Sequence, residues 1–136
     1  AYTRADQYNS SYGSSVVTAD EILNYDGATL DATDPYNYDL AATDGWEGGR
    51  MEVYENGSET GYVWRTVWAD EREAETFAEA WGDVVEHWGG SRNANGTYVI
   101  DEASPFTDAI AIHVEGDTVT VVNAPTAAEL TELYDA

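Results

Sequence analysis

The sequence predicts an α+β fold: a mostly antiparallel sheet of about five strands with two helices packed on one face, preceded by an irregular N-terminal arm. Three observations predict it. Turn signals join neighbouring strand patterns, two segments have helical periodicity behind capping residues, and the polar composition of the first 45 residues changes at Trp46. Hairpin-linked strands run antiparallel, and amphipathic helices must cover a sheet face. We therefore divide the chain into an arm (1–45) and an α+β domain (46–136).

The arm is rich in Asn, Ser, Tyr, Gly and Asp, and one regular element stands out in it. Thr18 and Glu21 form a capping box, which predicts the start of a short helix that Asp26 and Gly27 end. The polar stretch 31–44 contains Pro35 and is typical of a loop.

Five segments of the second region have the alternation or β-branched composition of strands. They are Arg50–Glu55, Tyr62–Trp68, Thr97–Ile100, Ala109–Val114 and Thr118–Val122. Asn56-Gly57 predicts a hairpin turn after the first, and Glu115-Gly116-Asp117 predicts another after the fourth. In the second strand, bulky residues alternate to both faces, with Trp64 on one face and Arg65 on the other. We therefore expect that strand to be central in the sheet.

Two segments predict helices. Asp70 and Glu73 form a box-like start to the first helix, which Gly89-Gly90 ends. Its apolar residues recur at helical spacing and give one stripe, with most glutamates off it: Phe77, Ala78, Trp81, Val84, Val85 and Trp88. Thr126 and Glu129 form a capping box ahead of Leu130 and Leu133, which predicts the second helix.

The charge is extreme. Twenty-seven Asp and Glu residues stand against five basic residues, all of them arginine, which gives a formal net charge of -22. Self-repulsion of this size destabilises a compact chain. The Debye length falls from about 10 Å at 0.1 M salt to about 3 Å at 1 M, so molar salt removes most of the repulsion. The charge therefore predicts a hypersaline solvent, loosely bound K⁺ or Na⁺, and no cofactor.

The composition also argues against several classes of site and partner. There is no cysteine, and the two histidines, His87 and His113, match no metal-binding spacing. With so many acids, a chance pair of carboxylates carries no catalytic signal, and no nucleophile motif is present, so we predict no catalytic and no metal residues. Scattered arginines make nucleic acid a poor partner, and no apolar run is long enough for membrane insertion.

The arginines that remain in the strands indicate the one candidate binding site. Arg50 and Arg65 lie in predicted strands close in sequence to Trp46 and Trp64. Arginine stacks on aromatic rings and pairs with carboxylates in a bidentate manner. One interpretation is a structural bridge to a nearby acid such as Glu52. The other is an anion-binding cleft lined by Trp46, Arg50, Trp64 and Arg65.

Four segments together carry a family resemblance: Gly45–Arg50, Val53–Tyr54, Tyr62–Trp68 and Ala74–Ala78. They resemble the Gly-Trp-Gly-Gly-Asp-Arg … Val-Trp-Arg-Thr-x-Trp-Asp … Ala-x-Glu-Phe pattern of a largely uncharacterised C-terminal domain of exported proteins from haloarchaea and some bacteria. This chain lacks the Asp before Arg50. The resemblance implies that longer relatives carry a zincin-like metallopeptidase segment upstream, and that this piece is a surface or secreted accessory domain.

Three functional hypotheses follow from these observations. The first is a non-catalytic accessory or interaction domain of a halophilic archaeal protein, extracellular or at the cell surface, with an upstream domain of the same polypeptide as its partner. The second is part of a zinc-metallopeptidase-like enzyme whose catalytic segment is absent here. The third is a small-ligand binding module that uses the Trp and Arg residues around Arg50 and Arg65.

The charge yields a test of salt dependence. Dilution of KCl from molar concentration to about 0.1 M should unfold the chain cooperatively, because screening of the carboxylates fails over that range. Circular dichroism along a KCl series at neutral pH measures this, and full stability in dilute buffer would contradict it.

Overall fold

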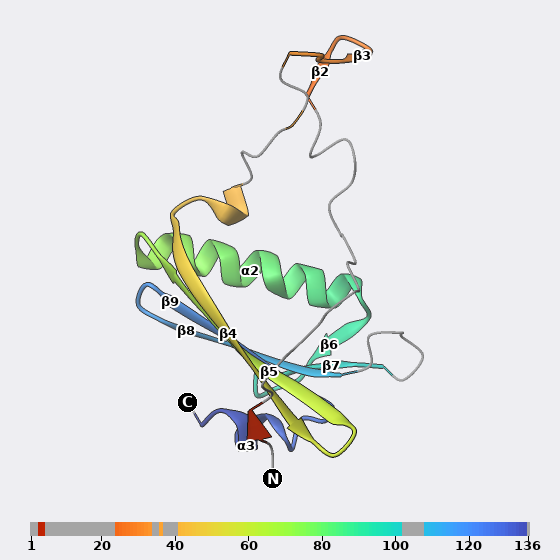
Figure 1. Cartoon of the computed structure of the whole chain (residues 1–136), viewed down its shortest axis with the longest axis vertical. Coiled ribbons are helices and arrows are strands. Elements are labelled where there is room, and N and C mark those ends of the chain that lie inside the picture. The colour runs from red at the N-terminus through yellow and green to blue at the C-terminus, as the bar shows by residue number, and fades with distance from the viewer. Residues whose placement is uncertain (1–2, 5–23, 34–35, 37–40, 102–107, 136) are drawn as a thin grey trace.

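A computed structural model of the chain describes residues 3–4, 24–33, 36, 41–101 and 108–135. Its main element is an antiparallel sheet with the strand order β1-β4-β5-β9-β8-β7-β6 (Figure 1). The strands are β1 (Thr3–Arg4), β4 (Trp46–Asn56), β5 (Glu59–Trp68), β6 (Gly90–Arg92), β7 (Tyr98–Ile100), β8 (Ala109–Glu115) and β9 (Thr118–Ala124). A small separate hairpin pairs β2 (Tyr25–Asp26) with β3 (Thr29–Leu30).

The α+β class and the mostly antiparallel sheet with two helices are confirmed. The described part of the sheet has seven strands, where about five were predicted. The two additional strands are short and polar: β1 pairs with the outer side of β4, and β6 pairs with β7. Neither has an alternating apolar pattern, so the sequence offered no signal for them. The start of the predicted short helix at Thr18 lies outside the described residues. Its predicted end is wrong, because Tyr25–Asp26 forms strand β2 and Gly27 lies in the turn to β3.

Strand β5 is central, as predicted, because β4 and β9 flank it. Its hairpin with β4 turns at Gly57, whose φ of 64° is in the left-handed region that favours glycine. The turn between β8 and β9 uses Gly116 in the same way, with a φ of 59°. Both predicted turn sites therefore join neighbouring antiparallel strands.

The long helix α2 (Glu71–His87) begins as the sequence predicted. The side chain of Asp70 accepts a hydrogen bond from the backbone N–H of Glu73 at 3.0 Å, so it caps the first turn. The buried positions Ala74, Phe77 and Val85 lie along one stripe, and the glutamates on the opposite side are exposed. The helix therefore presents its apolar stripe to the sheet.

The prediction that both helices cover the same face is wrong. α2 packs on one face, whereas α3 (Leu130–Leu133) lies on the opposite face (Figure 1). Two apolar clusters follow from this arrangement. The larger lies under α2, and the smaller contains Ala109, Ala111, Val122, Ala124 and Leu130 under α3. The chain passes to the second face because Pro125 follows directly on β9, leaving the last helix on the side where Val122 and Ala124 point.

The last helix is a single turn, and it begins at Leu130, later than the predicted capping box at Thr126 implies. Thr126 Oγ1 donates to Glu129 Oε2 at 2.6 Å, so the two box residues bond to each other through their side chains. Glu129, the residue before the helix, makes no side-chain capping bond. Without a capped start the helix remains one turn long, and it covers only part of its sheet face.

Aromatic side chains hold α2 to the sheet. Trp68 stacks on Phe77 with ring centroids 4.6 Å apart, and Trp64 meets Phe77 edge-on at 5.5 Å and Trp81 at 5.3 Å. Such pairs contribute about 0.5–1.5 kcal/mol each beyond their buried area. The indole N–H of Trp68 donates to Thr66 Oγ1 at 2.9 Å, which satisfies a donor that would otherwise be buried without a partner.

Gly82 allows this packing to extend to Tyr98 on β7. A Cβ atom at Gly82 would lie 2.6 Å from the Tyr98 hydroxyl oxygen and 3.4 Å from its Cζ atom. Glycine in the middle of a helix is less favourable than alanine by about 1 kcal/mol. The space it leaves for the phenol ring therefore explains its presence in α2.

Gly82→Ala should destabilise the protein by about 1–3 kcal/mol, although alanine is the better helix former, because the methyl group overlaps the Tyr98 hydroxyl. Tyr98→Phe in the Gly82→Ala background should recover at least half of the loss, because it removes the overlapping oxygen. Chemical denaturation of both single variants and the double variant measures the coupling between them. Additive effects would contradict this account of Gly82.

Candidate functional site

The sheet face that α3 leaves partly uncovered is the candidate site. We call it the open sheet face and define it by Arg50, Arg65, His113, Thr120 and Tyr134. Alternation along each strand directs the first four side chains to the side opposite α2, since their neighbours Trp64 and Val121 belong to the cluster under α2. Tyr134 is the residue that directly follows α3.

Two adjoining hollows lie on this face. The larger, of about 1160 Å³, is lined by polar residues that include two acids as well as Arg65: Arg65, His113, Glu115, Thr118, Thr120, Tyr134 and Asp135. The smaller, of about 240 Å³, is lined by Arg50, Glu52, Tyr54 and Leu133, together with Arg65 and Tyr134. Arg65 and Tyr134 line both, so these two side chains stand at the boundary between the hollows.

Arg50 and Arg65 lie directly opposite each other on β4 and β5. Like charges at directly opposite positions of an antiparallel pair are destabilising. Arg50 is compensated, since its Nη2 atom lies 2.9 Å from Glu52 Oε1. Arg65 is exposed and forms no ion pair with any residue that the structure describes. Its guanidinium is therefore available to a ligand.

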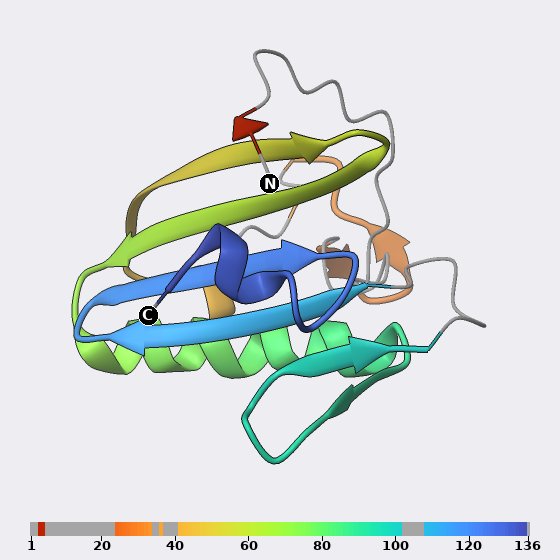
Figure 2. The same ribbon diagram turned by 90° about the horizontal axis from the view of Figure 1, so that it is seen from below.

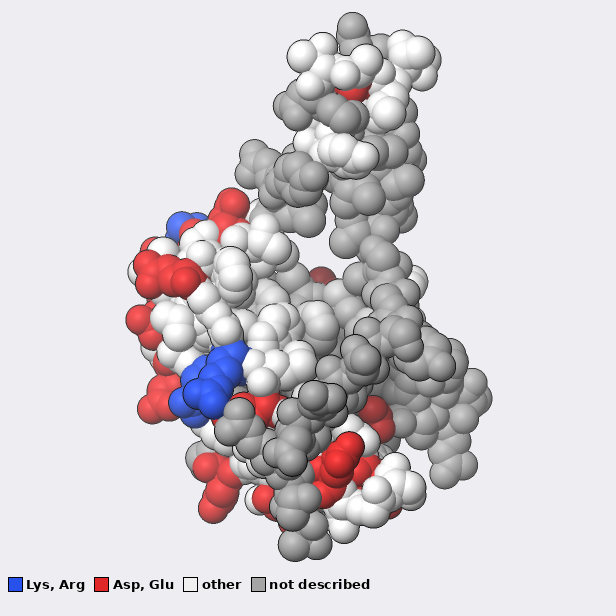
Figure 3. All heavy atoms as spheres, viewed as in Figure 1, with Lys and Arg blue, Asp and Glu red and all other residues white. Residues whose placement is uncertain are grey.

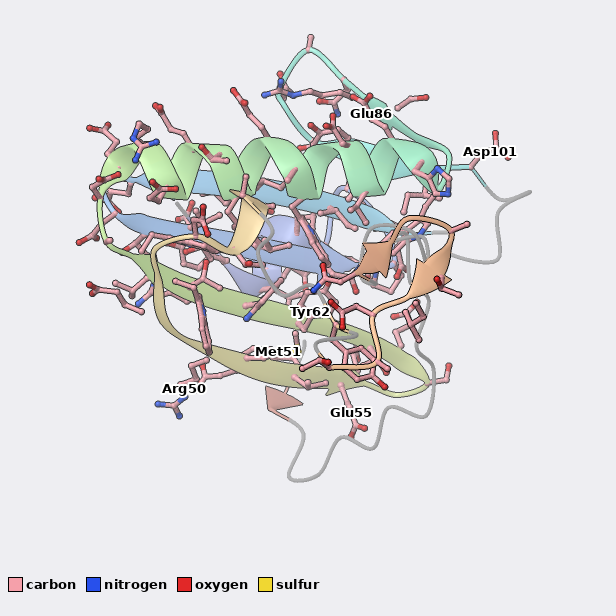
Figure 4. All side chains as sticks on the ribbon, turned by 90° about the horizontal axis from the view of Figure 1, so that it is seen from above. Arg50, Met51, Glu55, Tyr62, Glu86 and Asp101 are labelled. Atoms are coloured by element: carbon pink, nitrogen blue, oxygen red, sulfur yellow. The ribbon has the colours of Figure 1, made fainter. Side chains whose placement is uncertain are left out.

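Glu52 is held in place from two sides. Tyr54 Oη donates to Glu52 Oε2 at 3.2 Å, while Arg50 contacts the other carboxylate oxygen. The three residues alternate along β4 and so share the open sheet face. The bridge from Arg50 to Glu52 that the sequence offered as one interpretation is present, and it leaves Arg65 as the uncompensated member of the arginine pair. Figure 4 shows Arg50 projecting outward from β4.

The four predicted site residues do not form one cluster. Trp64 lies on the α2 face within the aromatic cluster, on the opposite side of β5 from Arg65. Trp46 pairs with Trp68 at the start of β4 and is 60% exposed. The structure therefore brings Arg50 and Arg65 together and separates both from the tryptophans.

Sequence reasoning missed the other members of the open sheet face. Tyr134 contacts His113, with ring centroids 5.6 Å apart, and the hydroxyl-bearing Thr118 and Thr120 come from β9. No local pattern in the sequence indicates these residues. It is the register of β5 with β9 that pairs Arg65 with Thr120. Pairing between strands 55 residues apart in sequence cannot be deduced from local patterns.

The surface around this face is acidic. Figure 3 shows Asp and Glu side chains spread over the described surface in that view, with basic side chains confined to two small areas. No group of three or more His, Asp or Glu residues in the described ranges is arranged to hold a metal ion. Nor does any described helix combine the length and apolar character needed to cross a bilayer.

One described carboxyl group is perturbed. Burial raises the pKa of Asp108 above its ordinary value of 3.8, and the hydrogen bond from Asn123 acts in the opposite direction. Asn123 Nδ2 donates to Asp108 Oδ2 at 3.0 Å, and the Asn123 side chain is itself buried. Asp108 lies beside the end of β7, away from the open sheet face, so it is a structural acid of the sheet.

Asp108→Asn should raise Tm at pH 7, because it keeps an oxygen for Asn123 and removes a half-buried charge. A raised pKa means that the folded state binds this proton more tightly than the unfolded state. The free energy of unfolding therefore falls as pH rises through the interval between 3.8 and the raised pKa. The Tm advantage of the variant should accordingly shrink as pH falls through that interval.

Glu115→Gln is the matched control, because it removes one exposed charge at the far end of β8, the strand that begins directly after Asp108. Thermal unfolding of both variants at pH 7 and near pH 4 separates local burial from the general relief of net charge. An equal Tm change in the two variants would contradict the assignment to Asp108.

Comparison with known proteins gives a family and no function. No curated protein and no solved structure matches the chain. A family profile matches residues 5–134, which is nearly the whole chain, and its description is a domain of unknown function, DUF8575. The chain belongs to the DUF8575 family.

Proposed function

We propose that this protein is a non-catalytic binding domain that takes an anionic ligand on its open sheet face. The observation that carries the proposal is the Arg50–Arg65 pair. Two of the five cations in a chain of net charge -22 are placed directly opposite each other, next to two hollows. This arrangement costs stability in the free protein. A bound anion would remove that cost.

The basic and hydroxyl groups of the lining favour an oxyanion carried on a small organic molecule. A guanidinium presents parallel N–H donors that match a carboxylate, sulfate or phosphate. Thr118 and Thr120 add hydroxyl groups, and the ring of Tyr134 adds an apolar wall between the two hollows. His113 lies opposite Thr120 on the neighbouring strand, but no hydrogen bond joins their side chains in the described residues, so the proposal is binding without catalysis.

We also propose the setting in which this domain works. The net charge supports a hypersaline environment, and the resemblance to exported haloarchaeal domains supports an extracellular or cell-surface location, with an upstream domain of the same polypeptide as its partner. The hypothesis of a metallopeptidase wall rests on the resemblance alone. We therefore retain the accessory domain with an anion-binding face.

Arg65→Gln tests the binding face. With citrate and sulfate as probes, the variant should lose about tenfold or more in affinity, since a hydrogen bond to a charged group contributes about 1.5–3 kcal/mol. Its stability should stay the same or rise, because the repulsion from Arg50 is removed. Amide chemical shifts of Thr118 and Thr120 in an NMR titration report binding, and thermal unfolding reports stability.

Arg72→Gln is the matched control. Arg72 is exposed on α2, where it pairs with Glu73, and it is outside both hollows. The control should change probe affinity by less than twofold. Equal losses in the two variants, or no loss in Arg65→Gln, would contradict the proposed function.

A further inference from the structure

The outer edge of β8 is open along much of its length. β7 pairs with β8 only at Ala109 and Ile110. Beyond that point the chain that would continue the pairing turns back on itself, since Asn93 N–H donates to Thr97 O at 2.8 Å and Gly96 N–H donates to Asn93 O at 3.1 Å. Figure 2 shows the hairpin of β6 and β7 (teal) diverging from β8 (light blue). No described strand lies beside the last part of β8 on that side.

Backbone donors and acceptors point outward from this edge. Ile100 N–H donates to Asp108 O at 2.8 Å, so Asp108 directs its backbone groups toward β7. In an antiparallel strand the N–H and C=O of every second residue point to the same side. Ile112 and Val114 therefore direct theirs toward the open side, while Ala111 and His113 direct theirs toward β9. Four backbone groups are thus presented to an incoming strand.

The edge has little of the protection that is usual, since the one acid of β8, Glu115, lies at the very end of the strand. Natural sheets protect their edges with lysine, proline, inward charges or bulges. The outer part of β4, also beyond the reach of β1, has such protection: a bulge between Trp46 and Gly48, and the charged Arg50. β8 has neither proline nor lysine, and Val114 is 42% exposed. Hollows lie on both sides of this edge, because Ile112 and Val114 line both the larger hollow and one of about 500 Å³ beside α2.

Charge identifies the partner. The hollow beside α2 is lined by three acids of that helix, Glu79, Asp83 and Glu86, and Figure 4 shows Glu86 between α2 and the hairpin. Among the described residues, the one cation lining it is Arg92, whose guanidinium lies over the Tyr98 ring, 5.8 Å from its centroid. A second copy of this chain, with its net charge of -22, would place further acids next to these three, and the like charges would repel. A basic segment would be complementary to them.

We propose that the Ile112–Glu115 edge of β8 binds a short extended basic segment of another protein as an added antiparallel strand. Opposed residues of paired strands share a face, so partner residues opposite Ile112 and Val114 face the acids of α2. The two partner residues that face these acids are lysine or arginine. The residue between them faces the open sheet face, where Arg65 and the acids Glu115 and Asp135 all line the larger hollow, so neither sign of charge is favoured and it is uncharged. The recognised pattern is therefore basic, uncharged, basic, and main-chain hydrogen bonds supply the affinity.

Backbone methylation of a probe peptide tests the proposal without altering the protein. The probe is a blocked seven-residue peptide, Ser-Thr-Lys-Val-Lys-Thr-Ser, titrated at the lowest KCl concentration at which the protein remains folded. Methylating the two lysine amides should weaken binding at least tenfold, because those amides pair with Ile112 and Val114. Methylating the central valine amide, which points away, should change it less than twofold. Equal affinity of both methylated peptides would show charge attraction alone and overturn the proposal.

Protein variants and hydrogen exchange add independent tests. Val114→Pro removes one edge donor and should weaken binding about tenfold, whereas Val114→Thr keeps the donor and should not. Asp83→Asn should weaken binding of the lysine peptide more than Glu71→Gln does, because Glu71 is on the same helix but does not line the hollow beside α2. The amides of Ile112 and Val114 should exchange rapidly in the free protein and slowly with peptide. Slow exchange without peptide would mean that the edge is already occupied, by the chain itself or by a second copy, and would overturn the proposal.

The proposed peptide binding at the edge of β8 and the proposed anion binding on the open sheet face can be tested separately. Arg65→Gln should leave peptide affinity unchanged within twofold. Arg65 lines the larger hollow together with Ile112 and Val114, but it lies on β5, two strands from β8, and on the face opposite the acids of α2 that the peptide lysines contact. A matching loss of peptide and citrate binding in that variant would show one shared site and contradict the assignment to β8.

Discussion

The packing of Trp64, Trp68 and Phe77 between β5 and α2 is the interaction on which the rest of the structure depends. The sheet and the helix share few large aliphatic residues, so aromatic rings supply most of the bulk in this layer. Thr66 connects that layer to the middle of the sheet, since its hydroxyl accepts from the Trp68 indole and donates to Val119 O at 3.2 Å. These contacts fix α2 over the sheet and determine which face of β5 remains for other uses.

That remaining face carries the candidate function. A central strand with bulk on both faces would ordinarily be covered twice, but α3 is one turn long and covers only the end that contains Val122 and Ala124. Gly61 lets Leu133 pack closely there, because a Cβ atom at Gly61 would lie 2.5 Å from Leu133 Cδ1. Beyond Tyr134 the sheet is open, and the arginines of β4 and β5 lie on it. The arginines of β4 and β5 are thus exposed because α3 is too short to cover them.

The acidic residues of the surface have different roles in different places. Over most of the molecule it fits a protein adapted to salt, since exposed carboxylates without partners contribute self-repulsion that salt screens. Beside the edge of β8 three acids line a groove next to unpaired backbone groups, where close contacts are screened less than distant ones. The same residue type therefore acts as solvating surface in one place and as a specificity element in the other.

The sequence by itself determined the elements whose signals are local: the capped helix α2, the turns at Gly57 and Gly116, and the central position of β5, which its two bulky faces indicated. Alternation along β5 already placed Trp64 and Arg65 on opposite faces, and combining them in one site disregarded it. Only the tertiary structure decided the face that α3 covers, the Thr120 partner of Arg65 and the open edge of β8. The first two depend on contacts between segments far apart in the chain, such as Leu133 with Gly61 and Arg65 with Thr120. The third depends on where the pairing of β7 with β8 stops, at Ile110. Such contacts are governed by the whole fold rather than by local propensity.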